Sequence, residues 1–174
     1  LVLDASRETV KTVVDLAKRH QCKIVIALNG DNKIYTTLLS SPVTRKQLVQ
    51  NIVNYTIQNQ FDGVDMDWEY PNATRANDIT FGLFMQELST ELHAWHRTLS
   101  MAVTAGLYAG GIKDGINQQA IDACDFVNLM AYDGINVDPA NLNHHSTYAM
   151  AQRVLKVWLE EKNLPKKKAV LGMP

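Results

Sequence analysis

The chain has 174 residues, of which 46% are apolar and 20% charged, and its formal net charge is −1 at pH 7. That composition is typical of one compact domain with a buried core and excludes a disordered chain. The balanced charge, with one short basic run at residues 166–168 that we interpret as a solvated turn, argues against nucleic acid as a partner. No apolar run reaches membrane-spanning length, which argues against membrane insertion.

The chain begins at Leu1, without an initiator methionine and without a segment of the signal-peptide type. We therefore expect it to be part of a longer protein. Its two cysteines, Cys22 and Cys124, lie far apart in the sequence and do not indicate a disulfide framework.

Apolar residues at helical spacing alternate along the chain with short apolar runs typical of buried strands. The pattern predicts helices over residues 8–20, 44–58, 78–96, 117–124 and 147–161, and strands over residues 23–28, 63–69, 99–104, 126–131 and 169–172. Strands separated by amphipathic helices predict an α/β fold with a parallel sheet, either doubly wound or part of a β/α barrel. Since no glycine-rich phosphate-binding motif of the nucleotide folds occurs, the barrel is the better prediction.

Polar residues stand at the C-terminal ends of several predicted strands, which is where such folds build their sites. They are Asn29, Gly30, Asp67, Glu69, Tyr132 and Asp133. The densest group lies in residues 61–71, F-D-G-V-D-M-D-W-E-Y-P, where four carboxylates occupy eight consecutive positions.

On a strand, Asp65, Asp67 and Glu69 share one face, while Met66 and Trp68 point to the other. Three like charges beside an apolar face repel one another and resist desolvation. A fold that needed only stability has no use for this arrangement, so the pattern predicts a site of chemistry.

Three interpretations of the carboxylates differ in kind. A calcium loop does not fit, because its glycine and its distant glutamate are missing, but a magnesium or manganese site at the strand ends stays open. A solvated edge strand disagrees with Met66 and Trp68. General acid catalysis of glycosidic bond cleavage fits best, because crowded carboxylates divide into one that holds a proton and one that stays ionised. Glu69, nearest the strand end, is then the proton donor and Asp67 its electrostatic partner.

The same residues form a known motif. D-x-x-D-x-D-x-E, filled by Asp62, Asp65, Asp67 and Glu69 and followed by Tyr-Pro, resembles the signature of family 18 glycoside hydrolases, the chitinases and their relatives. Residues 126–133, F-V-N-L-M-A-Y-D, resemble the sixth barrel strand of that family, residues 170–174 resemble the seventh, and residues 24–30 fall where the third is expected. The resemblance implies a (β/α)8 TIM-type barrel, here a partial barrel. Residues 1–174 would then be a partial catalytic domain with strands three to seven and without strands one, two and eight.

Residue by residue, the resemblance implies that Glu69 protonates the glycosidic oxygen. Asp67 then orients the 2-acetamido group of the substrate and stabilises the oxazolinium ion that forms when the acetamide oxygen attacks the anomeric carbon, a substrate-assisted and retaining reaction. Asp65 shares a proton or hydrogen bond with Asp67, and the Tyr132 hydroxyl holds the acetamide oxygen. The sugar-binding residues implied alongside them are Tyr70, Met130, Asp133 and Gly30. No metal and no organic cofactor is implied.

Two departures from the family are visible. Residues 27–30 read A-L-N-G where the family usually has S-x-G-G, and the tryptophan that usually floors the central subsite lies outside this chain. Trp95 and Trp158 fall on apolar helix stripes and are expected in the core, and Trp68 is expected beneath the helices. The adjacent His144 and His145 are interpreted as loop structure.

The resemblance implies chitin or chitooligosaccharides as substrates, with D-W-E-Y-P closer to chitinases than to endo-β-N-acetylglucosaminidases or peptidoglycan-directed relatives. The alternative is a non-catalytic, chitin-binding lectin of the chitinase type, although such relatives typically lose the glutamate that is present here as Glu69. By the same resemblance the protein is expected to be secreted or associated with the cell envelope.

Overall fold

The computed structural model describes residues 5–134 and 144–173, and its centre is one parallel five-stranded sheet in the order β1-β2-β3-β4-β5. The strands are β1 (Val25–Leu28), β2 (Gly63–Met66), β3 (Thr98–Val103), β4 (Phe126–Met130) and β5 (Ala169–Gly172). The helices are α1 (Arg7–Arg19), α2 (Asn32–Ser40), α3 (Pro42–Gln58), α4 (Asn77–Ala94), α5 (Gly111–Asp114), α6 (Gln118–Ala123) and α8 (Tyr148–Lys156), with short turns η1 (Ala73–Arg75), η2 (Val157–Glu161) and η3 (Lys166–Lys168). Five parallel strands in sequence order confirm the predicted α/β class. They also favour a barrel over a doubly wound sheet, where the strand order reverses.

Several helices begin where the sequence supplies a capping side chain. Ser6 accepts a hydrogen bond from the Thr9 amide at the start of α1, and Ser41 caps α3, which has a proline at its first position. Asp31 accepts hydrogen bonds from two amides at the start of α2. These oxygens satisfy amides that have no partner within the helix, so each loop enters its helix at a fixed residue.

Two helices were not predicted from the sequence, and strand β2 is three residues shorter than predicted. Helix α2 has only nine residues, including three β-branched ones, so its helical periodicity is weak. Helix α5 is a single turn. Strand β2 ends at Met66 rather than at residue 69, although the Asp67 amide still donates to the Leu28 carbonyl across the sheet. Glu69 therefore lies on a loop just beyond the strand.

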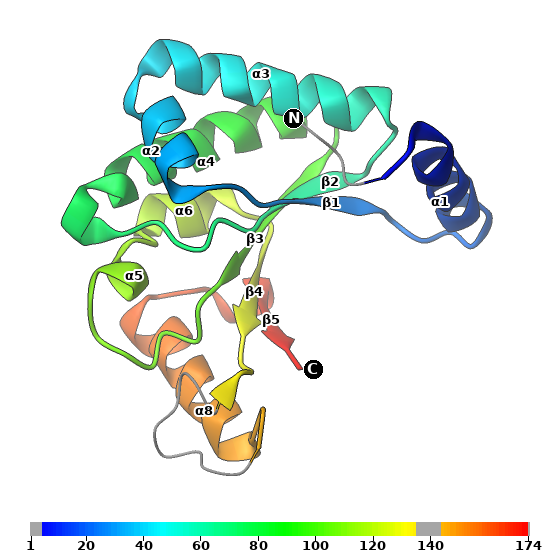
Figure 1. Cartoon of the computed structure of the whole chain (residues 1–174). Helices are drawn as coiled ribbons and strands as arrows, with labels where there is room; N and C mark the ends of the chain where they lie inside the picture. Colours follow the sequence, from blue (N-terminus) through cyan, green and yellow to red (C-terminus); the bar gives the residue numbers. More distant parts are fainter. Residues whose placement is uncertain (1–4, 135–143, 174) are drawn as a thin grey trace.

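The two faces of the sheet differ in what covers them. Helices α3, α4 and α6 lie over one face (Figure 1), and the strand residues that point toward them are almost fully buried. These are Val64, Met66, Leu99, Met101, Val103, Val127 and Leu129. The opposite face holds Asp65, Ser100 and Asn128, which the alternation of strand side chains places together.

The tryptophans test the core prediction. Trp158 is fully buried, and its indole N–H donates to the Thr104 carbonyl at 3.0 Å. Trp68 is 2% exposed and lies beneath the helices. Both side chains are in the core, as expected. The prediction for Trp95 is wrong, because that side chain is 56% exposed. Helix α4 ends at Ala94, and the chain turns away from the helical path at Trp95, so its side chain leaves the apolar stripe.

Strand β2 is paired on both sides, with β1 and with β3. This pairing rules out the solvated edge strand as an explanation of its carboxylates. Asp62, just before the strand, accepts a hydrogen bond of 2.8 Å from the Ile24 amide through its side chain. It therefore anchors the start of the strand pair.

Among the described residues, no helix combines the length and the apolarity that crossing a lipid bilayer requires. The basic run forms the short turn η3, and the Lys168 ammonium donates to the carbonyls of Ile121 and Asp122 beside α6.

Candidate active site

An open cavity of about 420 Å³ lies at the C-terminal ends of strands β2 to β5. Its lining residues are Asp65, Asp67, Glu69, Ala102, Asn128, Leu129, Met130, Tyr132, Gly172 and Met173. The structure thus brings together the three carboxylates of one face, Met130 and Tyr132, five of the residues proposed from the sequence. In α/β barrels this end of the sheet is where catalytic groups gather.

Asp65 is the deepest of the three carboxylates and is held from two neighbouring strands. Its Oδ1 atom accepts hydrogen bonds from the Ser100 hydroxyl and, at 3.0 Å, from the Asn128 side-chain amide. Two donors therefore hold one oxygen of this carboxylate in place. Sequence reasoning missed Ser100 and Asn128, although each is a polar residue in an otherwise apolar strand run, which is the signal that marks them.

Asp67 is half-buried and follows directly on β2. Burial, and then the negative charges of Glu69 and Asp65, raise the pKa of the Asp67 carboxyl above its ordinary value. The Asp67 carboxyl therefore holds a proton more tightly than an isolated carboxyl in water does.

Glu69 is exposed in the cavity and is held by its neighbours. The Tyr70 hydroxyl donates a hydrogen bond to the Glu69 side chain, and burial with this contact raises the Tyr70 pKa. The amide group of Asn32, the first residue of α2, donates to the Glu69 carbonyl at 3.2 Å and accepts at 2.5 Å from the Trp68 indole N–H. The beginning of α2, which was not predicted, thus fixes the loop that carries Glu69.

Tyr132 faces the carboxylates from β4. Burial, followed by the charges of Asp67, Asp133 and Glu69, raises the pKa of the Tyr132 hydroxyl. The hydroxyl consequently keeps its proton at neutral pH and can act as a hydrogen-bond donor toward a ligand in the cavity.

Three further residues proposed from the sequence do not line this cavity. Tyr70 reaches it only through Glu69, and the Asp133 carboxylate lies 2.6 Å from the Nε2 atom of His145. Gly30 lies beside the ring of Tyr35, where an added Cβ would come within 2.9 Å of the ring. That ring stacks on Trp68 with centroids 5.0 Å apart, and burial raises the Tyr35 pKa to about 12.

A second cavity of about 430 Å³ has a different lining. It includes Tyr70, the residue after Glu69, and Thr104, two residues beyond Ala102 of the first cavity, together with the half-exposed ring of Tyr108. It also contains Asn72 and Lys113. The chain that follows β2 and β3 thus contributes to this second cavity.

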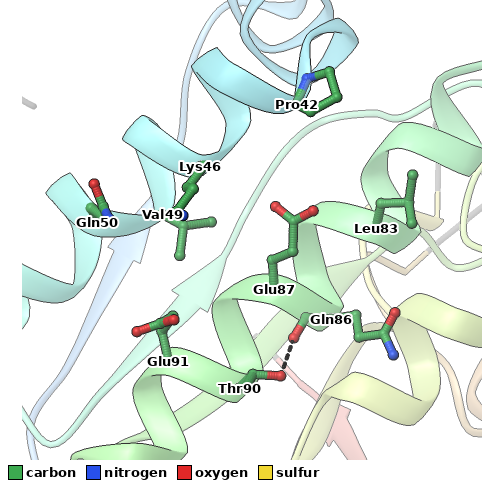
Figure 2. A pocket seen from close by; sticks show the side chains of 9 residues that line it. All are labelled: Pro42, Lys46, Val49, Gln50, Leu83, Gln86, Glu87, Thr90 and Glu91. Atoms are coloured by element: carbon green, nitrogen blue, oxygen red, sulfur yellow. Dashed lines mark hydrogen bonds between the residues drawn. The ribbon is translucent and has the colours of Figure 1, made fainter.

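A third hollow, of about 440 Å³, lies between α3 and α4 on the helix layer (Figure 2). Glu87 on its wall pairs with the buried Arg45, whose guanidinium also donates to the Leu39 carbonyl at 3.1 Å. This pair connects two helices and lies in a different layer from the β2 carboxylates. Since the three hollows have similar volumes, only their chemistry separates them, and the convergent carboxylates mark the first as the candidate site.

Within residues 5–134 and 144–173, no group of three or more histidine, cysteine or acidic side chains is arranged to hold a metal ion. The carboxylates of β2 instead bond to Ser100, Asn128 and Tyr70.

Comparison with known proteins gives consistent matches. The family model "Glycosyl hydrolases family 18" matches residues 3–174. Chitinase 1 of Aphanocladium album is 29% identical over 194 residues, covering 95% of this chain and 43% of that protein. The chain spans less than half the length of the curated relatives considered, 38%, 43% and 44% for three of them.

Solved structures agree in fold. A family 18 chitinase from the chitin utilization locus of Flavobacterium johnsoniae matches with a TM-score of 0.81 at 27% identity, covering 100% of this chain and 55% of that one. A second match is catalytic domain 2 of the Ostrinia furnacalis Group II chitinase, which was solved as a variant in complex with an N-acetylated chitooligosaccharide. It matches with a TM-score of 0.79 at 22% identity, and the match covers 99% of this chain and 50% of that one. The five strands are therefore part of a TIM-type barrel, as predicted.

The carboxylate motif, the sequential parallel strands and the family match over residues 3–174 lead to the same conclusion. This chain belongs to glycosyl hydrolases family 18.

Proposed function

We propose that the protein hydrolyses β-1,4 bonds next to N-acetylglucosamine, with retention and with the substrate's own acetamide as nucleophile. The observation that carries the proposal is the convergence of Asp65, Asp67, Glu69 and Tyr132 on one open cavity. Chitin or chitooligosaccharides are the proposed substrates. The Ostrinia relative, solved with an N-acetylated chitooligosaccharide, supports that choice.

Glu69 is the proposed general acid. Its carboxyl is exposed in the cavity, and its backbone is fixed by Asn32 and its side chain by Tyr70. A glycosidic oxygen needs a proton as it leaves, and an accessible carboxyl at a fixed position supplies it. The same carboxyl, once deprotonated, can activate the water that completes hydrolysis.

Asp67 and Tyr132 are proposed to act on the acetamido group. Attack by the acetamide oxygen produces a cationic oxazolinium ring, and the Asp67 carboxylate lies where it can stabilise that charge. Burial, and then the negative charges of Glu69 and Asp65, raise the Asp67 pKa, and the same negative charges attract a cation in this position. The protonated Tyr132 hydroxyl donates to the acetamide oxygen and holds it in line for attack.

Asp65 is proposed to be the hydrogen-bonding partner of Asp67. The Asp65 carboxylate is held in place by Ser100 and Asn128. From this position it can share a proton with Asp67 before the cation forms.

The leaving-group side of the substrate is proposed to lie in the second cavity. This space begins at Tyr70, which bonds to the Glu69 carboxyl, and a sugar attached to the protonated oxygen continues in that direction. The half-exposed ring of Tyr108 offers an apolar face on which a pyranose can stack.

We further propose that residues 1–174 are a partial catalytic domain with strands three to seven of a complete barrel, and that the protein acts outside the cytoplasm, because its polymeric substrate lies there. Sugar-binding roles for Met130, Asp133, Tyr70 and Gly30 belong to the same proposal.

Turnover of a fluorogenic chitobioside by the full-length protein tests the function. We expect release of the fluorophore, unchanged when a metal chelator is added. Binding of chitooligosaccharides without turnover would instead identify a lectin of the chitinase type, and turnover abolished by the chelator would favour a carboxylate metal site.

A further inference from the structure

The imidazole of His145 contacts the residue that follows Tyr132 in the chain. Its Nε2 atom lies 2.6 Å from the Asp133 carboxylate, and the Asp133 backbone amide donates to its Nδ1 atom at 3.4 Å. Because Nδ1 accepts a hydrogen bond, the network assigns the ring proton to Nε2, which donates it to the carboxylate. A single imidazole thus binds both the backbone and the side chain of Asp133.

The residue that precedes Tyr132 is held from the same segment. The hydroxyl of Ser146 donates to the Ala131 carbonyl at 2.6 Å, and the His145 carbonyl accepts from the Gly134 amide at 2.6 Å. Asp133 has a φ of 57°, in the left-handed region that few residues other than glycine adopt. The backbone on both sides of Tyr132 is therefore fixed by residues 145 and 146.

The Tyr132 ring itself lies between His145 and Gly172. The two rings are stacked, with centroids 6.1 Å apart and an angle of 22° between their planes. On β5, a Cβ added to Gly172 would approach the Tyr132 ring to within 3.0 Å, so the glycine allows the phenol to lie close against the strand. The phenol thus has a neighbouring ring and a strand backbone to limit its torsions.

We propose that His145 is a positioning residue for Tyr132, fixing the hydroxyl toward the Asp67 carboxylate by stacking on the phenol and by binding Asp133. This rests on the proposed function, in which that hydroxyl holds the reacting acetamide oxygen. His145 contacts no reacting atom in this scheme. The adjacent histidines, which the sequence indicated as loop structure only, then include one that supports the site.

A double-mutant cycle in the full-length protein tests the proposal. His145→Ala is expected to lower kcat/KM on a chitobioside about tenfold, since displacement of an orienting group is costly to turnover. His145→Phe, which keeps a ring on the phenol, is expected to recover most of that loss. In a Tyr132→Phe background, His145→Ala should cost less than about twofold, because His145 acts through the missing hydroxyl. Full additivity of the two substitutions would overturn the proposal.

The control is His20→Ala, an exposed histidine that ends α1 and belongs to neither cavity. It should leave kcat/KM unchanged. A tenfold loss in this variant as well would show that the effect of His145→Ala is not local, and would overturn the assignment.

A readout without substrate separates this proposal from the proposed function. With 3-fluorotyrosine incorporated, the fluorine NMR resonance that disappears in Tyr132→Phe reports on this ring. His145→Ala should shift or broaden it, and His20→Ala should not. If His145→Ala does not fold, His145→Gln, which keeps an N–H donor but removes the ring, gives the same readout. An unchanged resonance would refute positioning by His145. A changed resonance in a protein that turns over no chitobioside would support positioning and refute the hydrolase.

Discussion

The side-chain amide of Asn128 on β4 donates a 3.0 Å hydrogen bond to Asp65 on β2, reaching past the intervening strand β3. Ser100 on β3 donates to the same oxygen. Three strands therefore meet at one carboxylate, and hydrogen bonds from two of them fix the position of the Asp65 side chain.

This contact gives a first prediction. Asn128→Ala removes one of two donors to a half-buried carboxylate, and a hydrogen bond to a charged group contributes about 1.5–3 kcal/mol. Turnover of a chitobioside should fall roughly tenfold, since about 1.4 kcal/mol corresponds to a factor of ten. The same substitution at Asn54, on the exposed side of α3, is the control and should have no effect. Equal activity of the Asn128 and Asn54 variants would show that the anchoring of Asp65 is unimportant.

Glu69→Gln is expected to reduce kcat by at least about a hundredfold, because it removes the transferable proton while changing little volume. Binding of a chitooligosaccharide, measured by calorimetry, should stay within a few-fold of that of the unmodified protein. Glu91→Gln, at an exposed position of α4 beside the hollow of Figure 2, is the matched control. Near-normal turnover by Glu69→Gln would exclude this residue as the proton donor.

The raised pKa of Asp67 predicts a pH-dependent effect on stability. A carboxyl whose pKa is higher in the folded state binds its proton more tightly there, so its contribution to folding is lost as the pH rises from about 3.9 through the folded-state pKa. At pH 7 the ionised Asp67 carboxylate therefore destabilises the folded state. Asp67→Asn removes this destabilisation and should raise the thermal midpoint at pH 7, on the order of a degree. The difference should disappear near pH 4, and a midpoint lowered at pH 7 would contradict the cause given for the shift.

The two outer strands predict how residues 1–174 behave when expressed alone. Among the described residues, β1 pairs only with β2 and β5 only with β4, while Val170 and Met173 are 44% and 75% exposed. Unpaired strand edges and exposed apolar side chains favour association. We expect this segment alone to be inactive and to bind a hydrophobic dye. A cooperative thermal transition together with full activity would refute the proposed partial barrel.

Sequence patterns predicted the parts of the site that depend on local geometry. Alternation along a strand is a property of the backbone, so Asp65 and Asp67 could be assigned to one face without knowing the fold. Glu69 lines the same cavity, although it lies on the loop beyond the strand. Ser100 and Asn128 lie 35 and 63 residues from Asp65, and only the strand register brings them to it. The sequence carries no local signal for that register.

The loop residues could not be predicted for a related reason. Asn32 reaches Glu69 because the unpredicted helix α2 begins beside the β2 loop. His145 reaches Tyr132 because its segment folds back over the end of β4. Trp95 shows the opposite error, since one residue beyond the end of α4 the helical period no longer describes where a side chain points.

The central claim is that the acetamide oxygen of the substrate, held by Asp67 and Tyr132, is the nucleophile. The most direct test compares turnover of chito-oligosaccharides and cello-oligosaccharides of equal length by the full-length protein, with a chitooligosaccharide thiazoline as inhibitor. We predict cleavage of the chito series alone, and inhibition by the thiazoline far stronger than by product, because it mimics the cyclic intermediate. In Asp67→Asn and Tyr132→Phe, inhibition by the thiazoline should exceed inhibition by product to a smaller extent. Cleavage of both series at similar rates would mean that the enzyme supplies its own nucleophile, and it would contradict the roles given to Asp67 and Tyr132.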